Sequence, residues 1–236
     1  MLNDYTVRES ARAKHARLTV SPRQGLVVVI PIGYDRRRIP TLIREKKPWL
    51  ERCARRIESQ RGAFEPEPSG GLPERLQLRS IGEEWSIDYH PTDSNRVALS
   101  ERADSGLLIR GNAAKAADCH AVLARWLRRK AHAQLAPWLI EIADERGFRV
   151  THVSVRSQRT RWGSCSKKAR VSLNVKLLFL PEDLTRYVLL HELCHTVHLN
   201  HSKDFWRLVR DREPDVKDKE TSLRAAWRYV PAWLDA

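Results

Sequence analysis

The chain of 236 residues is 42% hydrophobic and 31% charged, with 12 Pro and 10 Gly. This composition excludes collagen-like, low-complexity and wholly disordered proteins. Its 43 Lys and Arg residues outnumber 29 Asp and Glu residues and give a formal net charge of +14 at pH 7. An excess of this size favours nucleic acid or another anionic partner, although basic residues spread along a chain are also typical of a solvated surface.

The hydropathy pattern contains no membrane or secretory segment. The longest apolar runs are strand-sized, well short of the roughly 18 residues that a membrane span needs. Basic residues interrupt any apolar stretch in the first 30 positions, unlike a signal peptide. The four cysteines form no CxxC pair and are typical of reduced thiols. We therefore expect a cytoplasmic protein with no membrane partner.

The first half of the chain predicts strands and one helix. Apolar runs at 17–20 and 26–30 flank a turn-rich segment and predict a hairpin. Apolar residues near helical spacing predict a helix over 38–58, which Pro48 would kink or split. Residues 62–74 are rich in Pro and Gly and predict a loop. Further short strands are predicted at 76–81, 85–90, 96–99 and 107–109.

The second half predicts a long helix followed by strands and further helices. Helical periodicity extends over 113–146, and strands are expected at 151–156 and 171–177, the latter with clean apolar–polar alternation. The sequence therefore indicates an α+β protein. We expect a β-rich N-terminal accessory region with one helix at 1–112 and an α+β domain that carries the chemistry at 113–236.

A metal-binding motif is present in the HELCH sequence at 191–195. In a helix, residues four apart share a face, so His191 and His195 can reach one cation. Glu192 is rotated by one position and can address a water on that cation. Pro181 and the two acidic residues after it are typical of a helix start and predict the helix that the motif requires.

The third ligand has two candidates. His201 follows Asn200, a residue that tolerates the left-handed conformation ending many helices, and a turn there would bring His201 back toward the metal. Glu213 is the alternative, as an acid supplied by a second helix. Three histidines and a water would complete an open tetrahedral zinc site, although other divalent transition metals also suit imidazole. We favour His201, and expect His198 to support a ligand or to lie on the surface.

The neighbouring residues are given structural roles. Ser202 is expected to cap a new helix in which Phe205 and Trp206 pack in the core and fix the turn that aims His201. Cys165 and Cys194 are expected to be structural, because HExxH chemistry needs no thiol.

An ordered set of motifs makes the sequence resemble a known family. The set comprises Arg161–Ser166, Val171–Asn174, Pro181, the HExxH and the run from Asn200 to Trp206. Together they resemble the YgjP-like metallopeptidase family, which is related to SprT-like proteases. The resemblance implies a small zincin-like catalytic domain, in which the HExxH helix packs on an antiparallel sheet. It also implies His191, His195 and His201 as ligands and Glu192 as catalytic base.

The resemblance leaves the substrate open. Its name implies hydrolysis of peptide bonds, but members of the family are also associated with hydrolysis of nucleoside triphosphates, notably UTP, to the monophosphate and pyrophosphate. The SprT-like kinship and the basic charge would also suit a nucleic-acid-associated protease. A purely structural zinc module is disfavoured, since such a site has no need for Glu192.

The substrate-binding residues differ between these hypotheses. A peptide would pair with the strand at 171–177 by strand addition. A nucleotide would need phosphate-neutralising residues beside the metal, for which the candidates are Arg159, Arg161, Lys167 and Lys168. Asn174 is a further candidate for substrate binding, and Trp162 is expected to pack in the core rather than stack on a base.

Overall fold

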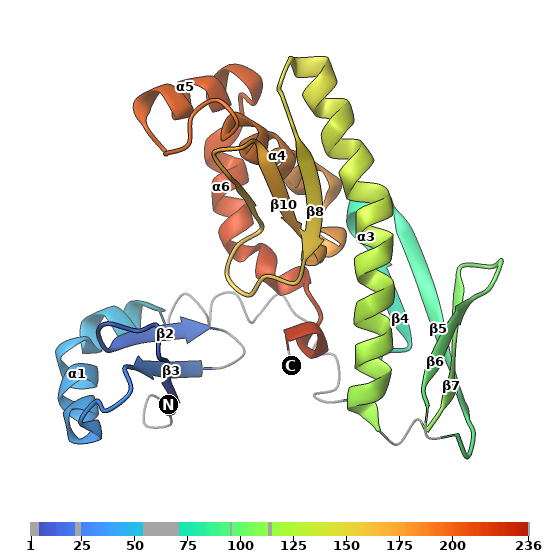
Figure 1. Ribbon diagram of the computed structural model, residues 1–236, viewed down its shortest axis with the longest axis horizontal. Coiled ribbons are helices and arrows are strands. Elements are labelled where there is room, and N and C mark those ends of the chain that lie inside the picture. Colours follow the sequence, from blue (N-terminus) through green and yellow to red (C-terminus); the bar gives the residue numbers. More distant parts are fainter. Residues whose placement is uncertain (1–4, 22–24, 54–70, 95, 113–114, 236) are drawn as a thin grey trace. The chain divides into compact units, whose positions relative to one another are not determined.

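The computed structural model describes residues 5–21, 25–53, 71–94, 96–112 and 115–235. The chain divides into two compact units, Met1–Glu65 and Pro66–Ala236 (Figure 1). The boundary that we expected at residue 112 therefore lies elsewhere. The reason is that strands before residue 112 and the long helix after it contribute to one hydrophobic core.

The first unit is a small mixed sheet with short helices. Its elements are β1 (Tyr5–Glu9), β2 (Arg17–Ser21), β3 (Gly25–Ile30), the 3-10 helix η1 (Arg36–Arg38) and α1 (Ile39–Glu45). The strand order is β1-β3-β2, with β1 parallel and β2 antiparallel to β3. The predicted hairpin is confirmed. The predicted helix is broken at Lys46 and resumes at 47–53. Its last part, 54–58, and most of the predicted loop at 62–74 lie outside the described residues.

The second unit begins with a four-stranded mixed sheet of order β4-β5-β7-β6. The strands are β4 (Arg75–Leu78), β5 (Glu83–Pro91), β6 (Ala98–Glu101) and β7 (Gly106–Gly111), with the 3-10 helix η2 (Arg79–Ile81) after β4. Pairing of β5 with β7 is parallel, and the two outer pairs are antiparallel. The four predicted strands are thus confirmed, although the first ends at Leu78 and continues as η2.

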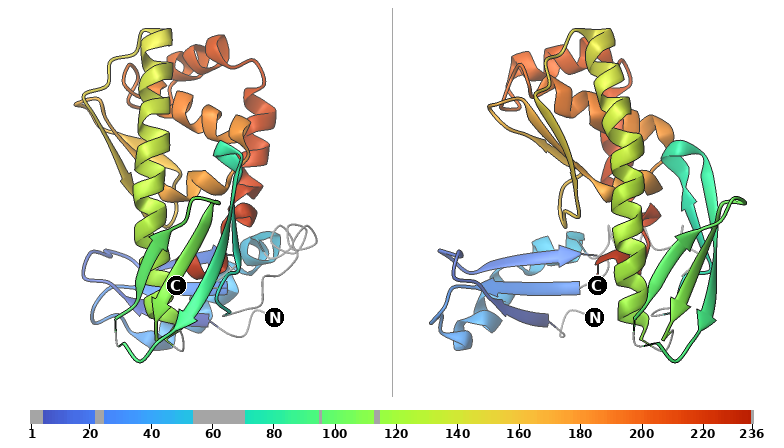
Figure 2. Two further views of the ribbon diagram at one scale, coloured as in Figure 1. Left: turned by 90° about the vertical axis from the view of Figure 1, so that its right-hand side faces the viewer. Right: turned by 45° about the vertical axis from the view of Figure 1, so that its right-hand side comes forward.

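The long helix α3 (Ala116–Arg146) joins this sheet to the rest of the unit. It packs against β6 and also against the later strand β8 (His152–Arg156), and the right-hand view in Figure 2 shows it between the two sheets. The Trp126 ring meets Trp85 of β5 edge-on, with centroids 4.9 Å apart. Gly147, at a φ of 73°, ends the helix in the left-handed conformation that glycine adopts readily.

A second sheet of the unit lies next to the HExxH helix. It contains β8, β9 (Gly163–Cys165) and β10 (Arg170–Asn174) in the order β8-β10-β9. Because β10 is parallel to β8 and antiparallel to β9, the sheet is mixed, and the expected antiparallel sheet is corrected. The strand predicted at 171–177 ends at Asn174 and continues as the buried 3-10 helix η3 (Val175–Phe179).

Three helices follow η3 and complete the unit. They are α4 (Glu182–Cys194), α5 (Lys203–Arg212) and α6 (Val216–Ala225), followed by the 3-10 helices η4 (Ala226–Tyr229) and η5 (Ala232–Asp235). Pro181 precedes α4, and Glu182 and Asp183 occupy its first turn, as predicted. Among the helices in the described part of the chain, none combines the length and the apolar character that crossing a membrane requires.

Candidate metal centre

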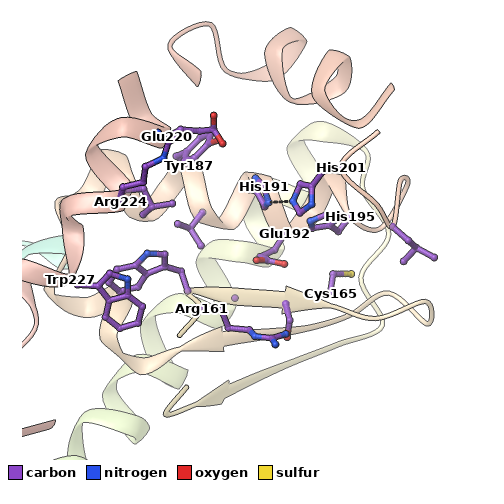
Figure 3. Close-up of a pocket in the computed structure, with 16 residues that line it drawn as sticks. Arg161, Cys165, Tyr187, His191, Glu192, His195, His201, Glu220, Arg224 and Trp227 are labelled. Carbon is purple, nitrogen blue, oxygen red and sulfur yellow. Dashed lines mark hydrogen bonds between the residues drawn. The ribbon is translucent and has the colours of Figure 1, made fainter. Parts of the chain in front are cut away.

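Three histidine side chains meet at the C-terminal end of α4. The ligand atoms of His191, His195 and His201 all lie within 4.8 Å of one another, and Nε2 of His191 is 3.1 Å from Nε2 of His201 (Figure 3). Two nitrogens bound to one tetrahedral zinc ion are about 3.3 Å apart, given a Zn–N distance near 2.05 Å. The donor set of three imidazoles also suits zinc and other transition metals. The three residues therefore fit a divalent metal ion.

The turn after α4 brings His201 to the other two histidines. The helix ends at Cys194, earlier than we expected, and residues 195–197 form a turn. Asn200 does not adopt the left-handed conformation, since the described non-glycine residues with positive φ are Ser105 and Ala169. The proposed role of Asn200 is therefore wrong. Ser202 caps α5 as predicted, and its hydroxyl accepts a hydrogen bond from the Phe205 amide at 3.3 Å.

The rings of α5 hold the imidazoles in place. Phe205 is fully buried and stacks on His195, with centroids 4.4 Å apart, while Trp206 stacks on His201 at 5.6 Å. Nδ1 of His195 lies 3.0 Å from the carbonyl oxygen of His198. With the proton on Nδ1, His195 donates to that carbonyl and keeps Nε2 for a metal, a common arrangement that fixes a ligand's orientation. His198 thus supports a ligand through its backbone.

Burial keeps these imidazoles neutral. Desolvation, with the adjacent His195 and His201, lowers the pKa of His191 to about 3. Desolvation also lowers the pKa of His195, against the opposing hydrogen bond to His198. A neutral imidazole is the form that binds a metal ion, so these two residues are ready to coordinate at neutral pH.

Glu192 lies beside the histidines in a tightly packed position. Its side chain is only 6% exposed, and Oε2 is buried without a hydrogen-bond partner among the described residues. Burial raises its pKa to about 8, while the Arg161 guanidinium acts in the opposite direction. Gly163 of β9 makes this packing possible, because a Cβ there would lie 2.7 Å from both Cγ and Oε1 of Glu192.

The two cysteines near the site are poor nucleophiles. Burial raises the pKa of Cys165 to about 11, with Glu192 adding to the effect, and raises that of Cys194 to about 12. At neutral pH both are therefore thiols rather than thiolates, which agrees with the structural role that we expected. Trp162 is buried as expected and stacks on Trp227 with centroids 4.1 Å apart.

A cavity of about 580 Å³ opens in front of the histidines. Figure 3 shows Arg161 and Cys165 on one side, with Tyr187, Glu220 and Arg224 at the other end. Sequence analysis did not identify these last three. Tyr187 precedes His191 by four residues and therefore shares its helix face, a signal that was available. Glu220 and Arg224 lie on α6, and only the fold brings them to the cavity.

The predicted substrate-binding residues fall in different places. Arg161 lines the cavity, whereas Arg159, Lys167 and Lys168 are exposed and do not. Asn174 is fully buried, and its amide donates to the carbonyl oxygens of Gln158 at 2.8 Å and Arg161 at 2.7 Å. It thus shapes the loop before β9 and does not face the cavity, so its assignment to substrate binding is corrected.

Two further expectations are decided by position. Glu213 is the C-cap of α5, and its carboxylate accepts a hydrogen bond from the Asp215 amide at 3.4 Å, outside the histidine cluster. The strand β10 is flanked by β8 and β9, so it has no free edge for a peptide. The edge strand that lines the cavity is β9, through Gly163, Ser164 and Cys165.

Comparison with known families now bears on this site. The model of the YgjP-like metallopeptidase domain matches residues 14–226, which is most of the chain. The chain belongs to the YgjP-like metallopeptidase family. Membership supports a metal-dependent hydrolase, and at the family level a metal-dependent peptidase.

The chain was also compared with curated proteins and with solved structures. No curated protein matches the chain. Among solved structures, the crystal structure of the metallopeptidase zymogen of Pyrococcus abyssi abylysin matches at 27% identity and a TM-score of 0.35. The match covers 38% of this chain and 91% of that one.

Proposed function

We propose that the protein is a zinc-dependent peptidase in which His191, His195 and His201 hold the metal ion and Glu192 is the general base. The observation that carries the proposal is the buried Glu192 carboxylate beside three converging histidines. A structural zinc site has no use for an unpaired acid in this position. A bound zinc ion would polarise the scissile carbonyl and lower the pKa of a water molecule.

The environment of Glu192 suits transfer of a proton in both directions. A carboxyl with a pKa near 8 can take a proton from the attacking water and then give it to the leaving amine, because its two forms differ little in free energy near neutral pH. The positive charge of a bound metal would lower that pKa toward neutrality. The close approach of Gly163 limits the positions that the carboxylate can adopt.

The edge of β9 offers a place for an extended peptide. Residues 163–165 line the cavity, and β9 pairs with β10 along only one of its sides. Main-chain groups on the free side can pair with a substrate strand, and side-chain pockets then select the sequence. Arg161 and Arg224 both line the cavity and favour acidic or carboxylate-bearing peptides.

Replacement of Glu192 by Gln tests the proposal most directly. We expect Glu192→Gln to lower hydrolysis of unfolded protein substrates by about 10³-fold while the bound metal is retained. Glu220→Gln, which changes an acid in the same cavity, is the matched control and should cost less than about tenfold. His201→Ala should instead lose the metal. Equal activities of Glu192→Gln and the wild type would overturn the assignment of the base.

A nucleotide pyrophosphatase is the second candidate, because two arginines line the same cavity. Arg161 and Arg224 could neutralise phosphate oxygens while Glu192 activates water for attack on phosphorus. Incubation of the metal-loaded protein with each nucleoside triphosphate, followed by measurement of pyrophosphate, decides between the candidates. Release that requires Glu192 and is lost in Arg161→Gln would establish the pyrophosphatase. No release from any nucleotide would leave the peptidase.

A further inference from the structure

The sheet formed by β8, β9 and β10 has a second face that the metal centre does not use. Helices α3 and α4 pack against its apolar side, where Val155, Val171 and Leu173 are buried. No described helix or strand of this unit covers the opposite side, as Figures 1 and 2 show. A separate cavity of about 360 Å³ lies there.

The strand register places a row of hydroxyl groups across this face. Ser172 of β10 is directly opposite Ser154 of β8 and Ser164 of β9, and residues directly opposite each other point to the same side of a sheet. All three serines line the cavity. The Ser172 hydroxyl and Oε1 of Gln158 are buried with no hydrogen-bond partner among the described residues. Such atoms in a cavity indicate a ligand or water that satisfies them.

Positive charge flanks the hydroxyl row at both ends. At one end, Arg170 of β10 lies opposite His152 of β8 in the strand register. At the other end, Arg156 follows His152 by four residues along β8, about 13 Å away at the usual rise per residue. All three line the cavity, and its lining includes no Asp or Glu. Among the described residues, neither arginine forms an ion pair. The turn after β9 adds the exposed Lys167 and Lys168.

These features point to a polyanion rather than to one phosphate group. The cations are spread along the strands, so a single phosphate cannot meet them all, whereas a chain of phosphates can. Three strands span only about 10 Å, a width that suits one nucleic acid strand rather than a duplex. No Phe, Tyr or Trp side chain lines the cavity, which favours contacts to the backbone over base stacking.

We infer that the outward face of the β8-β10-β9 sheet binds the phosphodiester backbone of single-stranded nucleic acid. Arg156 and Arg170 donate hydrogen bonds to phosphate oxygens at the two ends of the cavity, and the serine hydroxyls donate hydrogen bonds between them. Ser164 and Cys165 border both cavities, so the bound strand lies on the other side of β9 from the histidines. The site is independent of the substrate cleaved at the metal centre.

Fluorescence anisotropy with a labelled oligothymidylate of about 20 nucleotides tests the inference, with the full-length protein titrated from about 50 to 200 mM salt. We expect Arg156→Ser/Arg170→Ser to weaken binding by about tenfold at the lowest salt. The negative slope of log affinity against log salt should become less steep by about 1.4, or about 0.7 for each lost phosphate contact. The matched control is Arg125→Ser/Arg129→Ser, which removes the same charge from exposed positions on α3 outside the cavity.

Three results would overturn the inference. The first is no salt-dependent binding by the wild type. The second is an equal loss in the two double variants, which would mean that only net charge matters. The third is binding of inorganic phosphate or a phosphopeptide that competes with, and is tighter than, binding of the oligonucleotide. The site is supported if the salt slope is unchanged in Arg125→Ser/Arg129→Ser and becomes less steep in Arg156→Ser/Arg170→Ser.

Discussion

The apolar and polar faces of the β8-β10-β9 sheet share one backbone but differ in packing and charge. On the apolar face Val171 and Leu173 are buried, and Gly163 leaves room for the Glu192 side chain. On the polar face Ser172 and Arg170, the immediate neighbours of Val171, line an open cavity. Successive residues of a strand point to opposite sides, so a single substitution can address one face at a time.

In the proposed mechanism, packing positions the Glu192 carboxylate on the apolar face, whereas charge determines the proposed binding on the polar face. On the apolar face, a small displacement of the Glu192 carboxylate should lower the catalytic rate, because Gly163 packs closely against that side chain. On the polar face, side chains line a cavity instead of packing in the core. Substitutions there should therefore change the free energy of unfolding little.

Among substitutions in the sheet, Gly163→Ala should cause the largest loss. The added Cβ would lie 2.7 Å from Glu192 Cγ, so the carboxylate must move, and a displacement of about 1 Å can cost about 10² in rate. We expect kcat/KM for the best substrate to fall about 100-fold with metal content unchanged. Ser172→Ala, on the opposite face and outside the metal-site cavity, is the matched control and should remain within about threefold of the wild type. Similar losses in both variants would show that the two faces are not separable.

The next effect concerns the pH dependence of stability in the metal-free protein. Burial raises the pKa of Glu192 to about 8, so the folded state binds an extra proton between the unfolded value of about 4.5 and pH 8. Stability must therefore fall as pH rises through this window. His191, with its pKa lowered to about 3, has the opposite slope, but only below about pH 6.5. The lowered pKa of His195 acts in the same direction as that of His191. The raised pKa values of Cys165 and Cys194 act only above about pH 9, so the Glu192 contribution dominates between pH 6.5 and 8.

Chemical denaturation after removal of the metal measures this slope. Between pH 6.5 and 8 the wild type should lose about 2 kcal/mol, at 1.36 kcal/mol for each pH unit, relative to Glu192→Gln. Above about pH 8.5 the difference should become constant. A parallel pair of curves for the two proteins over the whole range would mean that Glu192 is solvated in solution, contrary to its burial here.

The sequence predicted the histidine cluster better than the sheet beside it. The HExxH spacing, the Pro181 start of α4 and the Ser202 cap are local signals within a few residues, so they survive without knowledge of the fold. His201 was favoured over Glu213 from sequence, and the structure brings His201 to the cluster. What the sequence could not show was how the chain turns, since Asn200 does not have the conformation on which that argument rested.

The sheet was harder because its pattern depends on distant partners. At three residues, β9 is too short for an alternating pattern, and the parallel pairing of β8 with β10 joins segments without any local signal. Asn174 was predicted to bind substrate from within a strand expected at 171–177. It is instead buried by the loop that it binds. Likewise, the row of serines could not be predicted from the sequence, because it depends on the register of three strands.

The smallest effect on stability is expected at Ser172. Its hydroxyl is buried without a partner among the described residues, and removal of an unsatisfied polar group is neutral or slightly stabilising. Ser172→Ala should therefore change the free energy of unfolding by less than about 0.5 kcal/mol. Val171→Ala, one residue earlier and buried on the other face, should cost about 2 kcal/mol. Urea denaturation of the two variants measures both values.

The same substitution also distinguishes a structural from a binding role for the hydroxyl. If Ser172 donates to a phosphate, Ser172→Ala should weaken oligonucleotide binding severalfold at unchanged stability and leave the salt slope intact, because no charge is lost. A loss of stability above about 1 kcal/mol would instead mean that the hydroxyl has a partner within the fold. A residue that contributes nothing to folding but measurably to binding is what a surface selected for a ligand should contain.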